Sequence, residues 1–222
     1  MADSNNGCNF KGCKSVLLLV LHYSQLTFSI PFSINLSMAE HICPWWLGYA
    51  LANPLRKLIN NPDSILKPFV AEGMRVLEVG PGMGFFSVPI ARLVGPRGRL
   101  YCVDVQQKMI DGLKRRLEKK GVLDRVEARV CTSDSLAIDD LRQSIDVVLA
   151  IAVIHEIPRA DQSIADMAGA LRSGGKMVIS EPAGHVTPAG FAGTTALARN
   201  CGLLVIANPV VRGTLSVVLQ RP

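Results

Sequence analysis

The chain has 222 residues, 49% of them hydrophobic, which is enough for one domain with a substantial core, and it contains no repeat or low-complexity tract. Its formal net charge is +6, but aromatic residues make up only 5% and do not interleave with the basic run at 108–120, so no nucleic-acid partner is expected. The six cysteines show no paired metal-site spacing, and free thiols in a reducing cytoplasm are the expectation.

Residues 1–37 form an unusual start to the chain. They hold a polar stretch with Lys11 and Lys14, then an apolar run at 16–21 and a Ser-rich apolar stretch. The apolar run is too short to span a bilayer, and no small-x-small cleavage site of a signal peptide follows it before Met38. We therefore expect a poorly ordered or extension segment, a functional chain that begins at Met38, and no membrane span.

The most informative segment, residues 76–84, joins an apolar strand to alternate glycines, with an acid just before them. Glycines at this spacing allow a tight turn and let a ligand approach the backbone, where side chains would clash. The next residues, 85–94, predict a helix whose N-terminus faces the ligand. The segment therefore predicts a loop that binds a nucleotide-type cofactor, and a glycine-rich turn without a ligand is the simpler alternative.

Two details of this loop separate the possible cofactors. A dinucleotide loop of the G-x-G-x-x-G kind needs a glycine at position 85, and the chain has Phe85 there. Glu78 lies two residues before the first glycine, where a carboxylate would repel a pyrophosphate. S-adenosylmethionine carries a sulfonium and an α-amino group and has no phosphate. The loop therefore favours S-adenosylmethionine over NAD.

With these residues the chain resembles the class I S-adenosylmethionine-dependent methyltransferases, from about residue 61 to the C-terminus. The resemblance implies an α/β fold: a Rossmann-like, doubly wound sheet of seven strands in the order 3-2-1-4-5-7-6, strand seven antiparallel, with helices on both faces. It also implies that residues 71–222 form the S-adenosylmethionine-binding domain and that Glu78 helps to orient the amino group of the cofactor. The loop residues that would pass under its methionyl part are Gly80, Pro81, Gly82 and Gly84.

The predicted second strand, 100–104, ends in an acid that matches the second motif of the family. Asp104 has two carboxylate oxygens, which can accept both ribose hydroxyls at once. Val105 would then offer an apolar face to the adenine ring. The separation of Asp104 from Gly84 leaves room for one helix and one turn between the two parallel strands.

The third and fourth strands, predicted at 126–131 and 145–151, complete the expected cofactor site. Asp134 is the candidate acceptor for the adenine amino group, with Ser135 beside it, and a turn-capping aspartate is the alternative interpretation. Ala150 lies near the end of the fourth strand, whose nearly continuous apolar sequence indicates that helices cover both of its faces. The remaining expected elements are a helix at 161–171, a turn at 172–176, a strand at 177–181, a helix at 191–200 and a hairpin of 203–210 with 214–219.

Residues 38–70 correspond to the segment that commonly forms a helical lid over the substrate in this family. Both tryptophans, Trp45 and Trp46, lie here together with Tyr49. Two interpretations stay open, because these side chains could line an apolar substrate pocket or could merely hold a helix against the sheet.

The loop after the fourth strand contains the candidate catalytic residues. His155 is the best candidate for a general base, because an imidazole titrates near neutral pH and the loop lies at the carboxyl edge of the sheet, where such folds bind ligands. Glu156 would orient His155 or contact the substrate, and a purely structural histidine is the alternative. Weaker candidates are His41, His185 and, as a polar substrate contact, Glu181.

We therefore expect methyl transfer from S-adenosylmethionine to a small-molecule acceptor by direct displacement, with the nearest resemblance to quinone-biosynthesis methyltransferases. No metal is expected, because metal-assisted members of the class place an Asp-Asn pair after strand five, where this chain has Glu181 and Pro182. The methylated atom and the oligomeric state cannot be predicted. The alternatives are a nucleotide-dependent oxidoreductase and a non-catalytic cofactor-binding or assembly protein of the same fold.

Overall fold

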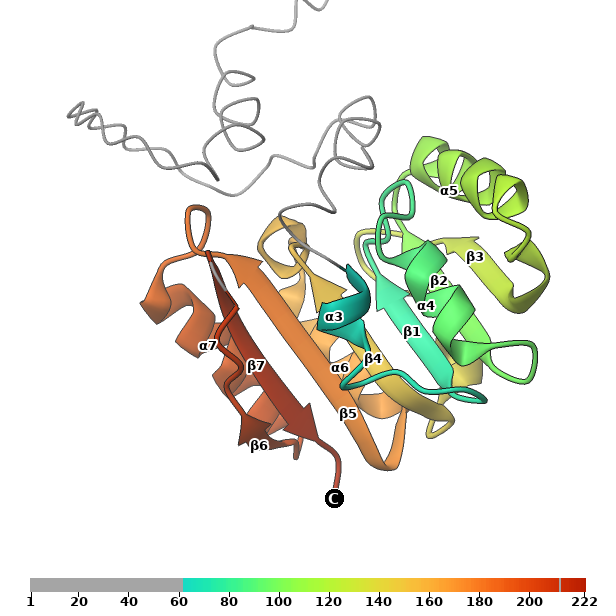
Figure 1. Ribbon diagram of the computed structural model, residues 1–222. Helices are drawn as coiled ribbons and strands as arrows, with labels where there is room; N and C mark the ends of the chain where they lie inside the picture. Colours follow the sequence, from blue (N-terminus) through green and yellow to red (C-terminus); the bar gives the residue numbers. More distant parts are fainter. Residues whose placement is uncertain (1–61, 212) are drawn as a thin grey trace, which may run out of the picture. The chain divides into compact units, whose positions relative to one another are not determined.

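The computed structural model describes residues 62–211 and 213–222 (Figure 1). Its centre is a seven-stranded sheet in the order β3-β2-β1-β4-β5-β7-β6. The strands, in chain order, are β1 (Arg75–Val79), β2 (Arg99–Asp104), β3 (Val126–Val130), β4 (Ile145–Ile151), β5 (Leu171–Pro182), β6 (Leu204–Ala207) and β7 (Thr214–Gln220). Strands β1 to β5 pair in parallel, and β7 pairs antiparallel with both β5 and β6, so the predicted order and direction are confirmed.

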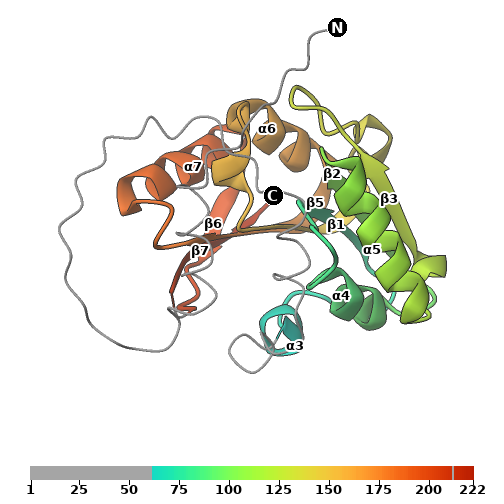
Figure 2. The ribbon, with the colours of Figure 1, turned by 90° about the horizontal axis from the view of Figure 1, so that it is seen from above.

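Two helical layers enclose this sheet (Figure 2). The helices are α3 (Pro62–Leu66), α4 (Ser87–Val94), α5 (Gln107–Lys119), α6 (Ala160–Ala170) and α7 (Pro188–Asn200), with short 3-10 turns η2 (Leu123–Arg125), η3 (Asp139–Leu141) and η4 (Ile154–Glu156). One apolar core lies under α3, α4 and α5, and the other lies under α6 and α7. Strand β4 shows why its sequence is almost entirely apolar: Val147 and Leu149 face the first core, whereas Val148 and Ala150 face the second.

Two helices begin two or three residues away from their predicted starts. Helix α7 starts three residues earlier than predicted, because Thr187 Oγ1 accepts a hydrogen bond from Gly190 N–H at 3.1 Å and Pro188 occupies the first turn. Helix α4 starts at Ser87 rather than at Phe85. The preceding residues instead form the turn of the glycine loop, closed by the hydrogen bond from Gly84 N–H to the Pro81 carbonyl.

The predicted separate turn at 172–176 is wrong, because these residues belong to β5. The pairing with β4 moves from Ile145 opposite Leu171 to Val147 opposite Lys176, so the extra residues bulge out of the ladder. Backbone hydrogen bonds to Arg221 hold this bulge in place. Gly174 N–H donates to the Arg221 carbonyl, and Arg221 N–H donates to the Gly175 carbonyl, each at 2.9 Å.

The predicted extension at 1–37 and most of the predicted lid, including His41, Trp45, Trp46 and Tyr49, lie outside the described residues. Only residues 62–70 of the lid segment are described, and they contain α3. Within 62–211 and 213–222, none of the helices has both the length and the apolar character that a membrane crossing requires.

Candidate active site

The glycine loop follows β1 at the carboxyl edge of the sheet, and its glycines have left-handed backbone angles. The φ angles are +68° at Gly80, +52° at Gly82 and +83° at Gly84. A Cβ added at Gly80 would lie only 2.3 Å from Val153 Cγ2, whereas a Cβ added at Gly82 would meet no atom within 4 Å. Gly80 thus lets the loop pack against the loop after β4, while the backbone at Gly82 stays accessible to a ligand.

The acid before the glycines, Glu78, is buried in β1, with 5% of its surface exposed. Its Oε2 accepts hydrogen bonds from Ser87 Oγ at 2.6 Å and from Cys102 Sγ at 3.6 Å. Burial raises the pKa of Glu78 to about 7, although the bonds from Ser87 and Cys102 act in the opposite direction. The carboxyl group is therefore held in a place where its charge is costly unless a cation joins it.

Asp104 ends the neighbouring strand β2 and is also buried, with 9% of its surface exposed. Its Oδ1 accepts a hydrogen bond from Gln106 N–H at 2.9 Å. Burial raises the pKa of Asp104 to about 6, against the lowering effect of hydrogen bonds from the backbone of Gln106 and Gly82. The charge of Asp104 also raises the pKa of Glu78. None of the ion pairs formed by residues 62–211 and 213–222 includes either acid.

The remaining predicted cofactor residues lie in different surroundings. Val105 is 38% exposed, directly after Asp104. Asp134 and Ser135 are both exposed, in a turn that Thr132 closes by accepting a hydrogen bond from Ser135 N–H on its Oγ1 at 3.1 Å. Ala150, in contrast, is fully buried in the core under α6 and α7.

His155 lies in η4, immediately after β4, and contacts an acid that comes from β5. Its Nδ1 is hydrogen-bonded to Glu181 Oε2. The other oxygen of Glu181, Oε1, accepts the backbone N–H groups of Val153 at 3.2 Å and Ile154 at 2.8 Å. Glu156, the predicted orienting acid, keeps its Oε1 3.9 Å from His155 Nε2. From the sequence, Glu181 is predicted only as a substrate contact. Its position at the end of the strand next to β4 is the feature that could have indicated its contact with His155.

The structure also brings His185 to this cluster. Its Nδ1 lies 3.4 Å from His155 Nε2, and the two rings meet edge to face with centroids 5.3 Å apart. Burial lowers the pKa of His155, but the hydrogen bond and charge of Glu181 outweigh burial, so the net shift is upward. Burial and the charge of His155 lower the pKa of His185. The two imidazoles thus differ in their affinity for a proton.

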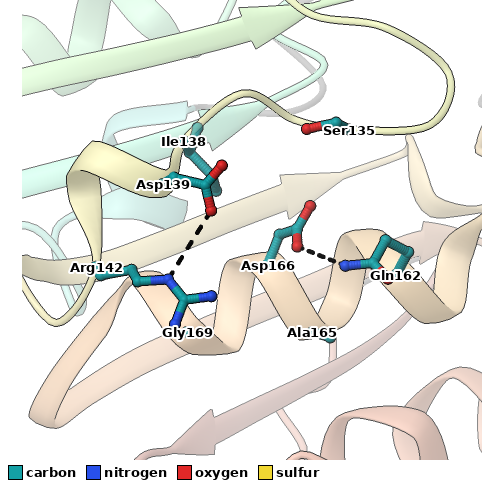
Figure 3. Close-up of a pocket in the computed structure, with 8 residues that line it drawn as sticks. All are labelled: Ser135, Ile138, Asp139, Arg142, Gln162, Ala165, Asp166 and Gly169. Carbon is teal, nitrogen blue, oxygen red and sulfur yellow. Dashed lines mark hydrogen bonds and ion pairs between the residues drawn. The ribbon is translucent and has the colours of Figure 1, made fainter.

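A separate hollow of about 120 Å³ lies between η3 and α6 (Figure 3). Its polar walls are already internally paired: Arg142 faces Asp139 at 3.9 Å, and Gln162 donates to Asp166 at 2.8 Å. Of the predicted site residues, only Ser135 lines it. The glycine loop and the histidine cluster therefore stay the candidate site, rather than this hollow.

The sheet order, the glycine loop and the two buried acids define a Rossmann-like cofactor-binding domain of the methyltransferase kind. A profile of the family described as "Methyltransferase domain" matches residues 71–201, more than half of the chain. The chain belongs to this family, and with it to the class I S-adenosylmethionine-dependent methyltransferases.

Among curated relatives, the chain is similar to the ubiquinone/menaquinone biosynthesis C-methyltransferase UbiE of Pseudomonas entomophila. The two are 28% identical over 112 residues, which are 50% of this chain and 43% of the relative. The matched part thus spans less than half of that relative's length.

Two solved structures share the fold. A SAM-dependent methyltransferase from Aquifex aeolicus superposes with a TM-score of 0.73 at 20% identity, over 82% of this chain and all of that one. The (4+2)-cyclase SpnF superposes with a TM-score of 0.63 at 15% identity, over 74% of this chain and 81% of that one.

Proposed function

We propose that this protein transfers the methyl group of S-adenosylmethionine to a small-molecule acceptor by direct displacement. One observation carries the proposal: two buried carboxyl groups, Glu78 and Asp104, flank an accessible glycine backbone and form no ion pair within the described residues. Buried charges are normally paired, so this arrangement fits a ligand that carries positive charge. A pyrophosphate in the same place would be repelled, which disfavours the oxidoreductase alternative.

The residues of the loop have distinct parts in holding this cofactor. The cofactor, when bound, supplies an electrophilic methyl carbon on a positively charged sulfur. Glu78 provides negative charge beneath the methionyl amino group, and Gly82 leaves room for close approach to the backbone. Asp104 accepts the ribose hydroxyls, and the exposed face of Val105 packs against adenine. Asp134, with Ser135 beside it, is exposed after β3 and accepts a hydrogen bond from the adenine amino group.

A small molecule is the proposed acceptor because the curated relatives act in quinone biosynthesis, as their names state. The position of His155 at the carboxyl ends of β4 and β5 supports an acceptor site on that side of the glycine loop. The cytoplasm stays the predicted location.

A second candidate function is favoured by the likeness to SpnF, a protein named for a cyclisation. In that case the chain would bind the cofactor without transferring its methyl group. Calorimetric titration with S-adenosylmethionine and with NAD tests the cofactor, and we expect binding of the first alone. Incubation with methyl-labelled cofactor and a small-molecule cell extract then tests the transfer. Labelled product supports the methyltransferase, whereas binding without any labelled product would support the second candidate.

A further inference from the structure

Glu181 is the most deeply buried acid among the described residues. It is 1% exposed, and its two oxygens have different partners: Oε1 takes the N–H groups of Val153 and Ile154, and Oε2 takes His155 Nδ1. A carboxylate held by two backbone donors cannot rotate without losing both hydrogen bonds. Glu181 therefore fixes which nitrogen of His155 points inward.

The orientation of His155 directs its second nitrogen toward His185. With Nδ1 bound to Glu181, Nε2 faces His185 Nδ1 at 3.4 Å. Both imidazoles are partly exposed. Among the contacts formed by residues 62–211 and 213–222, none reaches His185 Nε2, so this atom is the open end of a chain that runs from Glu181 through His155 to His185.

The loop that carries His155 also packs against the glycine loop. Ala152, which is not a glycine, has a φ of +56°, and its N–H donates to the Ser180 carbonyl at 2.7 Å. The next residue, Val153, fills the space over Gly80. Strained backbone persists where the surroundings over-determine it, and here those surroundings place the histidines next to the cofactor loop.

We propose that Glu181, His155 and His185 form a proton-accepting chain for an acceptor that arrives as a weakly acidic O–H, such as a phenol or enol. This inference rests on the proposed function. The acceptor O–H gives its proton to His185 Nε2, while the Nδ1 proton of His185 passes to His155 Nε2. The acceptor electron pair forms the new bond to the methyl carbon, and the electrons of the broken carbon–sulfur bond stay on sulfur. The positive charge rests on His155, beside Glu181, and its proton later leaves to solvent.

In this proton-accepting chain, His185 is the catalytic base, and Glu181 is a positioning residue. The groups that raise the pKa of His155 are Glu181 from β5 and Glu156 from η4, and His185, from the segment between β5 and α7, faces its Nε2 at 3.4 Å. Glu181 raises the pKa of His155, and His155 lowers that of His185. A proton gained by the pair therefore settles on the ring of His155. A weakly acidic O–H needs such a base, whereas a neutral amine does not.

The experiment uses the full chain with carbon-13-labelled histidine, and NMR titration of the two rings. In the wild type, His155 should titrate above pH 6.5 and His185 below it. Glu181→Gln keeps an oxygen for Val153 and Ile154 but removes the charge, so the His155 pKa should fall below that of the wild type. Glu156→Gln is the matched control and should shift it less. An unchanged His155 pKa in Glu181→Gln would overturn the proposed proton-accepting chain.

The second arm measures methyl transfer from labelled S-adenosylmethionine to an alkyl-hydroquinone, with the corresponding aniline as the amine probe. We expect transfer to the hydroquinone, with kcat/KM rising with pH as His155 loses its proton. Both His185→Asn and Glu181→Gln should lower kcat roughly 100-fold, and Glu181→Gln should also move the inflection to lower pH. No transfer to the hydroquinone, equal transfer to the aniline, or a wild-type profile in His185→Asn would each overturn the inference.

Cofactor binding by the same samples separates the two proposals. If the wild type fails to bind S-adenosylmethionine, the proposed function fails, whatever the histidines do. If it binds the cofactor and methylates an acceptor with a pH profile that Glu181→Gln leaves unchanged, only the proton-accepting chain fails.

Discussion

Val153 packs directly over the backbone of Gly80, so closely that a Cβ at Gly80 would lie 2.3 Å from Val153 Cγ2. The two residues follow adjacent parallel strands, β1 and β4, whose carboxyl ends meet at one edge of the sheet. Val153 N–H also donates to Glu181. The cofactor loop and the histidine cluster are therefore one packed unit rather than two neighbouring loops.

The contact predicts that Gly80→Ala damages both stability and cofactor binding. The methyl group meets Val153, and the φ of +68° strains any side chain, so we expect a loss of about 2–4 kcal/mol in the free energy of unfolding. Urea denaturation measures this loss. The control is Gly121→Ala, where φ is +64° but no atom lies within 4 Å of the added Cβ, and only the strain of about 1–2 kcal/mol is expected. Equal losses in the two variants would contradict a role for the Val153 contact.

Gly82→Val and Asp104→Ala should each abolish cofactor binding while the fold is largely kept. The valine side chain would enter the open space above the loop, and the alanine would remove the acceptor for the ribose hydroxyls. In each case we expect calorimetry to detect no binding of S-adenosylmethionine, which corresponds to an affinity at least roughly 100-fold weaker.

The control for these variants is Asp124→Ala. Asp124 is an exposed acid in η2, before the start of β3 and thus at the opposite edge of the sheet. It should bind the cofactor like the wild type. Normal binding by both Gly82→Val and Asp104→Ala would show that the cofactor site is elsewhere.

The buried Glu78 predicts that the stability of the ligand-free protein depends on pH. The pKa of Glu78 is about 7 in the folded protein against 4.5 ordinarily, so between these values the folded state binds this proton more tightly than the unfolded chain does. The free energy of unfolding should therefore fall as pH rises from 4.5 to 7, by up to ~3 kcal/mol from this group. Denaturation at several pH values, compared with Glu78→Gln, measures the difference. A wild-type minus variant difference that is flat across this range would contradict the buried acid.

The same acid links cofactor binding to proton release. A positively charged amino group favours ionised Glu78, so binding below pH 7 should expel a proton, and affinity should increase as pH rises toward 7. Calorimetry in two buffers with different ionisation enthalpies counts the released proton. Glu78→Gln should release none through this group.

Arg221 predicts a stability effect without a binding effect. Its Nη1 donates to the carbonyl groups of Ala168 at 3.1 Å, Gly169 at 3.3 Å and Leu171 at 2.8 Å, where α6 ends and β5 begins. Arg221→Ala leaves these carbonyls without their charged donor and should cost about 2 kcal/mol in urea denaturation. Arg221→Lys should recover part of this loss. A weaker affinity for S-adenosylmethionine in Arg221→Ala would contradict a purely structural role.

The sequence predicted the elements whose signals are local. Strand β4 has the predicted bounds, and apart from Asp146 its residues form a continuous apolar run. The beginning of α7 was predicted too late, although Thr187 and Pro188 form a local start signal. The bulge in β5 could not be predicted, because it depends on hydrogen bonds with Arg221, far along the chain.

The sequence by itself determined the glycine loop and the acid before it, since the glycine spacing and Glu78 lie within a few residues of one another. Only the tertiary structure decided which acid holds His155. Glu156 is adjacent in sequence, yet Glu181, 26 residues away, makes the contact, because parallel pairing sets Ile151 opposite Ser180 and so brings the ends of β4 and β5 together. The register of β4 against β5 is set by pairing between segments that lie far apart in the sequence, so the residues around His155 do not reveal it by themselves.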